Sequence, residues 1–98
     1  MFRMIIEIDE NRMKHDGLDN IKLMNELDKL IKDIPEIQEK EKGIFETDDS
    51  GARSWLLEQL EECEWFMKYV CKWIIDDPAV YEDAIKTYRK MGLQCCYE

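Results

Sequence analysis

The stretch WLLEQLEECEWFMKYVCKWII, residues 55–75, decides how this sequence is expected to fold. Its apolar residues recur at intervals of four and three, which is the spacing of one face of an α-helix. They are Leu56, Leu60, Cys63, Met67, Val70 and Ile74. Ser54, just before the stretch, is a favoured helix N-cap. We therefore predict an amphipathic helix over residues 54–76 that buries Leu60 and Val70, and we leave open a break within residues 61–64.

The chain before this helix shows two further patterns. Residues 2–9 alternate between apolar and polar side chains, which predicts a strand. Asp9 then caps a short helix over residues 10–16, and Gly17 ends it in a left-handed conformation. A second helix follows over residues 20–33, with Asp19 as its N-cap and Pro35 beyond its end.

The rest of the chain is expected to supply one more strand and one more helix. Residues 36–42 form a charged connector, residues 43–47 a short strand, and residues 48–51 a turn. Asp77 as N-cap and Pro78 at the first helical position begin a last helix, which Gly92 closes. The predicted fold class is α+β, helix-dominated, with two short strands packed against helices in the order β-α-α-β-α-α. Residues 93–97 are an alternative third strand.

Composition limits the possible functions. The chain has 98 residues, 45% of them hydrophobic, and its formal net charge is -9. This length and apolar content predict a single acidic α+β domain, residues 1–98. The negative charge disfavours direct binding to nucleic acid or to anionic membranes. The apolar run of residues 4–6 is too short for a secretory signal, so we expect a cytoplasmic protein.

Catalytic and metal-binding patterns are missing from the sequence. The chain has one histidine, His15, in a polar stretch, and four cysteines. Cys95 and Cys96 are adjacent, and Cys63 and Cys71 share the predicted helix, so we expect no disulfide framework and reduced cysteines. No nucleophile is seen with an orienting partner, and the glycines are isolated. We therefore expect no enzyme activity, no cofactor and no metal.

The outer face of the predicted long helix is the candidate binding surface. Trp65 falls opposite the apolar stripe, among acidic side chains, and exposed aromatic residues are typical binding hot spots. Carboxylates three or four residues apart lie about 5 to 6 Å apart and can occupy a site built for phosphates. The candidate partner-binding residues are Glu58, Glu61, Glu62, Glu64, Trp65, Tyr69, Asp48, Asp49, Asp76 and Asp77. The competing interpretation is that these charges only keep the surface soluble.

Two segments carry a resemblance. The segments IEIDE, residues 6–10, and EWFMKYV, residues 64–70, resemble small acidic proteins carried by mobile genetic elements, a setting that includes anti-CRISPR inhibitors. The resemblance covers about a third of the chain and transfers no functional residue. It implies an inhibitor, and some small acidic inhibitors mimic DNA.

Together these observations favour a non-enzymatic inhibitor or adaptor. It would present an acidic, DNA-mimicking helix face to a basic partner protein, such as a nucleic-acid-handling enzyme. The alternative is a homodimeric structural or accessory subunit that self-associates through an exposed strand edge and an aromatic flank. This flank lies beside the apolar stripe of the predicted helix and consists of Trp55, Phe66 and Trp73.

Overall fold

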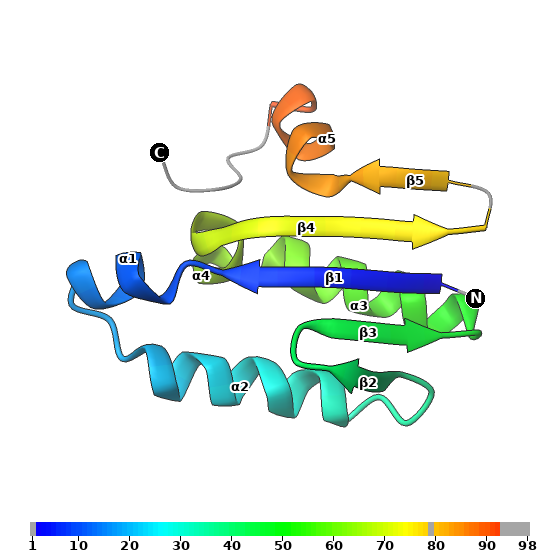
Figure 1. The fold of residues 1–98 in the computed structure, drawn as a ribbon, viewed down its shortest axis with the longest axis horizontal. Helices are drawn as coiled ribbons and strands as arrows, with labels where there is room; N and C mark the ends of the chain where they lie inside the picture. Colours follow the sequence, from blue (N-terminus) through cyan, green and yellow to red (C-terminus); the bar gives the residue numbers. More distant parts are fainter. Residues whose placement is uncertain (1, 79, 93–98) are drawn as a thin grey trace.

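A computed structural model describes residues 2–78 and 80–92. In these residues, the chain forms five strands and five helices in the order β-α-α-β-β-α-α-β-β-α (Figure 1). They are β1 (Phe2–Ile8), α1 (Glu10–His15), α2 (Asn20–Lys32), β2 (Gln38–Glu41), β3 (Ile44–Thr47), α3 (Ser50–Glu62), α4 (Glu64–Tyr69), β4 (Val70–Asp77), β5 (Val80–Asp83) and α5 (Ala84–Lys90). The elements up to α2 follow the sequence prediction closely, whereas β2 and most of the elements after β3 do not.

The strands form one antiparallel sheet in the order β2-β3-β1-β4-β5. The prediction of a helix-dominated fold with two or three strands is therefore wrong. One missed strand is β2, which lies inside the predicted charged connector and pairs with β3. All four of its side chains are exposed, so its sequence QEKE lacks the apolar alternation by which a half-buried strand is recognised.

The main correction concerns residues 70–77, which form β4 and not the end of a long helix. This segment is rich in β-branched and aromatic residues, which favour strands. Trp73 and Ile75 point into the core, whereas Lys72 is exposed. The helical spacing up to Ile74 was therefore misleading, because pairing of β4 with β1 overrides it.

The helical part of the predicted segment is itself divided. It starts at Ser50, with Asp49 and not Ser54 as its N-cap, and it breaks at Cys63 between α3 and α4. The break falls within residues 61–64, the segment in which we left open an interruption of the predicted helix. Leu60 and Val70 are both buried as predicted, although Val70 belongs to the strand.

The predicted last helix starts later than expected. Residues 80–83 form β5, which pairs with β4, and the helix α5 begins at Ala84. Asp83 is its N-cap and accepts hydrogen bonds from the backbone N–H groups of Ile85 (3.1 Å) and Lys86 (3.4 Å). Asp77 binds Arg53 instead (2.8 Å). Gly92 follows α5 with φ 84°, as predicted, and the alternative strand over residues 93–97 lies outside the described residues.

The core lies between the sheet and the helices. Phe2, Met4 and Ile6 of β1 point to one face of the sheet. Residues of α2, α3, α4 and α5 pack in the same cluster, so the helices cover that face. In Figure 1 the opposite face of the central strands β1 and β4 is turned to the viewer, with α3 and α4 behind them. In the described residues, the sheet thus has one face that the helices cover and one open face, on which no helix packs.

Gly43, in the β2–β3 hairpin, provides a test of the missed strand. Gly43 and Gly17 both have positive φ, 85° and 81°, so alanine at either position would be strained by about 1 to 2 kcal/mol. A Cβ at Gly43 would also lie 2.5 Å from the carbonyl oxygen of Ile6, whereas a Cβ at Gly17 meets nothing within 4 Å. We expect Gly43→Ala to lower the free energy of unfolding by clearly more than Gly17→Ala in urea titrations. Equal losses would contradict the described hairpin.

Candidate partner-binding surface

The carboxylates predicted for partner binding lie in two separate places. Glu58, Glu61 and Glu62 are exposed on α3, and Glu64 is exposed at the start of α4. They lie away from the buried side of α3, which Ala52, Leu56 and Leu60 occupy, and Glu61 also accepts a hydrogen bond from the hydroxyl of Tyr88. We call these four glutamates the α3–α4 acidic surface.

Asp48 and Asp49 stand at the other end of α3. Both are exposed, and Asp49 accepts a hydrogen bond from the backbone N–H of Ala52 (2.8 Å). Asp76 and Asp77 lie at the end of β4, where Asp77 pairs with Arg53 of α3 (2.8 Å). Asp48, Asp49 and Asp77 line one shallow pocket with Arg53, so this second acidic group is partly neutralised.

The aromatic residues exchange their expected roles. Trp65 is only partly exposed, since it packs on the core with its ring centre 6.5 Å from that of Phe66. Trp55 is 42% exposed. Trp55, Glu58 and Glu62 follow one another at positions i, i+3 and i+7 of α3, and such residues share one side of a helix. The aromatic residue beside the acidic surface is therefore Trp55, which the sequence pattern placed next to the core stripe.

Tyr69 does not belong to any exposed surface. It is 4% exposed, and its hydroxyl donates a hydrogen bond to the carboxylate of Asp16 (2.6 Å). This hydrogen bond, followed by smaller effects of His15 and Arg12, lowers the pKa of Asp16. Tyr69 thus joins α4 to the end of α1, which is a structural role.

The two described cysteines, Cys63 and Cys71, differ in their exposure. Cys63 is half-buried between α3 and α4, and burial raises its pKa. Cys71 is exposed and donates to the carbonyl oxygen of Glu7 (3.4 Å). The raised pKa makes Cys63 a weaker nucleophile at neutral pH. In residues 2–78 and 80–92, no three His, Cys, Asp or Glu side chains gather as metal ligands.

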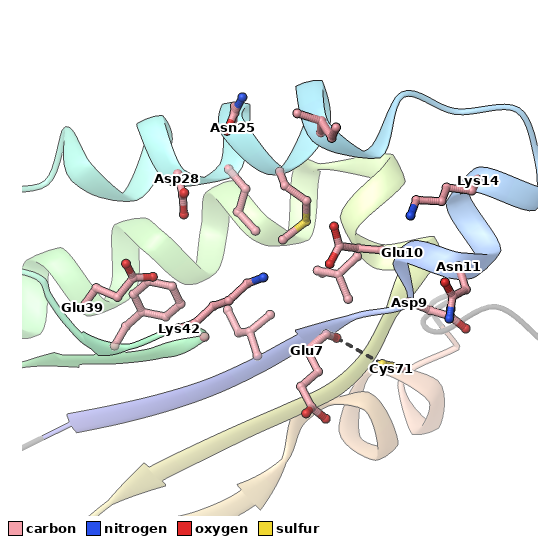
Figure 2. A pocket seen from close by; sticks show the side chains of 17 residues that line it. Glu7, Asp9, Glu10, Asn11, Lys14, Asn25, Asp28, Glu39, Lys42 and Cys71 are labelled. Carbon is pink, nitrogen blue, oxygen red and sulfur yellow. Dashed lines mark hydrogen bonds between the residues drawn. The ribbon is translucent and has the colours of Figure 1, made fainter.

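A cleft of about 850 Å³ lies between α2 and the end of β1, a site that the sequence did not indicate (Figure 2). Ile6, Leu27 and Phe45 are among its apolar lining residues. Glu10 and Lys42 point into it in Figure 2. Glu10 accepts a hydrogen bond from the side chain of Asn20 (3.1 Å). Apolar surface with charges of both signs can hold a polar ligand. The lining is negative overall, because it has five acidic side chains and two basic ones, Lys14 and Lys42.

The contact between Tyr69 and Asp16 has a pH-dependent effect. Because the folded state lowers the pKa of Asp16, its contribution to stability is present above the unfolded value, about 3.9, and is lost as the pH falls through the lowered folded value. We expect Tyr69→Phe to lower the urea midpoint at neutral pH, with a smaller difference from the parent in strong acid. Tyr81→Phe is the control, since Tyr81 is 73% exposed. A difference that does not depend on pH would contradict this role.

Comparisons with known proteins do not assign the chain to a group. No protein family matches it, and no similar curated protein or solved structure was found. The resemblance to mobile-element proteins therefore stays a hypothesis. A further finding is that no helix in the described part of the chain is long and apolar enough to cross a membrane.

Proposed function

We propose that this protein is a non-enzymatic binding protein of the cytoplasm, an inhibitor or adaptor that presents an acidic helix surface to a basic partner. The observation that carries the proposal is the α3–α4 acidic surface, with Trp55 beside it. Glu58, Glu61, Glu62 and Glu64 are all exposed. Buried residues hold the opposite side of α3 against the core, so the surface is presented on a packed element.

Electrostatics supports a basic partner. The chain has a formal net charge of -9, which speeds the encounter with a positively charged surface. Neighbouring carboxylates on a helix are about 5 to 6 Å apart, a spacing of the same order as that of successive phosphates in a nucleic-acid strand. A nucleic-acid-handling protein offers a basic channel for phosphates, and the acidic surface would occupy that channel as a DNA mimic.

Trp55 would supply the short-range part of the affinity. A tryptophan that is 42% exposed leaves a large apolar area in water, and burial of such an area in a partner's pocket is a common source of binding energy. Charges at the edge of an interface act mainly on association, whereas a buried anchor acts on dissociation. The two features therefore have separate kinetic effects.

The electrostatic part is tested with a partner captured from the native cell and identified by mass spectrometry. We expect the triple variant Glu58→Lys, Glu62→Lys, Glu64→Lys to slow association, most strongly at low ionic strength. Glu61 is left unchanged because it accepts a hydrogen bond from Tyr88. The measurement is biolayer interferometry with the captured partner at several salt concentrations.

The matched control is Glu26→Lys, Glu36→Lys, Glu41→Lys, three exposed acids outside α3 and α4. Both triple variants change the formal net charge from -9 by +6, to -3. Equal slowing by the two variants would show that only net charge matters, and the α3–α4 acidic surface would not be the binding site.

The anchor is tested separately. We expect Trp55→Ala to speed dissociation of the captured partner, with a loss of about 2 kcal/mol or more at every salt concentration. Ile21→Ala is the control, because Ile21 is an exposed apolar residue (69%) on α2. Unchanged dissociation of the Trp55 variant, with its fold checked by circular dichroism, would exclude Trp55 as an anchor.

A further inference from the structure

The open face of the sheet carries a row of three isoleucines. Ile5 of β1 lies directly across from Ile44 of β3 and from Ile74 of β4. Directly paired residues of antiparallel strands point to the same face, so the row crosses three strands. All three are partly exposed. An apolar row in the middle of an uncovered sheet face is unusual for a surface that only faces water.

Charged side chains flank this row in an alternating pattern. On one side, Arg3 of β1 lies across from Asp76 of β4; on the other side, Glu7 of β1 lies across from Lys72 of β4. Figure 2 shows the Glu7 carboxylate pointing away from α2, toward the open face. On this face, β1 and β4 thus have one positive and one negative residue each. The positive residue of β1 and that of β4 lie on opposite sides of the row. The signs alternate in both directions around the row.

We propose that a second copy of this chain packs on the open face, with a two-fold axis along the isoleucine row. Rotation by 180° about this axis exchanges the two flanks. Arg3 then faces Glu7 of the second copy, and Lys72 faces its Asp76. The isoleucine rows meet at the centre of the interface. The pattern is therefore complementary to itself, as an interface between identical subunits requires.

The geometry favours this axis over the other two-fold arrangement in the plane of the sheet. An axis along β1 would place Arg3 of one copy opposite Arg3 of the other. It would also place Glu46 of β3 opposite Asp76 of the second copy's β4, so like charges would meet. Facing sheets pack about 10 Å apart, a gap that isoleucines fill from both sides and that pairs of long charged side chains can span. The axis along the row combines apolar contact with opposite charges on both flanks. The like charges that it brings together, those of Asp83 on β5 and Glu41 on β2, lie at the two ends of the row.

The formal net charge of -9 on each copy opposes the association. This repulsion acts at long range and is screened beyond about 8 Å at physiological salt, whereas the facing pairs are in direct contact. The face spans few strands, so the interface is smaller than the standard of about 1,600 Å². A weak dimer results, with a dissociation constant in the low micromolar range.

The dimer is independent of the partner proposed for the acidic surface. The α3–α4 acidic surface lies on the helix layer, on the far side of the core from the open face. A face-to-face dimer leaves both acidic surfaces free and turned outward, so it would offer two binding surfaces at once. Loss of self-association would not affect a single acidic surface.

The experiment uses two charge-reversed proteins and sedimentation velocity at about 0.15 M salt, where charges beyond about 8 Å are screened. The first carries Arg3→Glu and Asp76→Lys, and the second carries Glu7→Lys and Lys72→Glu. In each, the pair formed by β1 and β4 within one copy stays opposite in sign, and the net charge does not change. Arg3→Glu also removes the ion pair of Arg3 with Glu46 of β3 (3.5 Å), so the fold of each charge-reversed protein is checked by circular dichroism. Between two identical copies, however, every facing pair becomes like-charged. In a mixture of the two proteins, every facing pair is again opposite in sign.

We expect the parent protein to form dimers as its concentration rises, toward twice the monomer mass of 11.8 kDa. Each charge-reversed protein alone should dissociate at least about tenfold more readily, which corresponds to about 1.4 kcal/mol. An equimolar mixture should regain dimers. Three results would overturn the proposal. The first is a parent protein that stays monomeric at about 0.5 mM, which is more than a hundredfold above a low-micromolar dissociation constant. The others are dimers that the charge reversals do not weaken and a mixture that does not regain dimers.

Discussion

The packing of Trp73 holds the two layers of the molecule together. Trp73 lies on β4 and is 0% exposed. Its ring is 5.0 Å from Phe66 of α4, edge to face, and 5.0 Å from Tyr88 of α5, nearly parallel. Its indole N–H donates to the sulfur of Met4 on β1 (3.0 Å). The side chain of Trp73 thereby joins β4 to β1, α4 and α5. All of these contacts lie on the covered face of the sheet, so the other face stays open.

The elements from β1 to α2 could be predicted because their patterns are local. The alternation in β1, the N-caps Asp9 and Asp19, and Gly17 each depend on a few neighbouring residues, and the structure has them as expected. The later elements depend on contacts between distant residues. Residues 70–77 fit a helical period nearly as well as a strand, and only pairing with β1 decides between them. A single sequence does not display that pairing.

The sequence predicted correctly that the glutamates of the candidate surface are exposed, but it predicted Trp65 as the aromatic residue beside them, whereas the structure has Trp55 there. The glutamates of α3 are exposed because acidic side chains on a helix face solvent unless they are paired. Trp65 and Tyr69 were placed by extending one helix through Cys63, and the break there moves both toward the core. Trp55 lies ahead of the break, so the true start of α3 leaves it beside Glu58 and Glu62. The open face of the sheet was hidden for the same reason, since Lys72, Ile74 and Asp76 had been assigned to the helix.

The decisive question is therefore whether residues 70–77 form a strand beside β1, because the five-stranded sheet and its open face follow from that pairing. NMR spectroscopy of the labelled protein answers it directly, through backbone chemical shifts and cross-strand nuclear Overhauser effects. We expect strand shifts from Val70 to Asp77 and contacts between the backbone protons of Ile5 and Ile74. Helical shifts that continue past Tyr69, with contacts between residues three apart up to Ile75, would contradict the fold and the dimer surface on its open face.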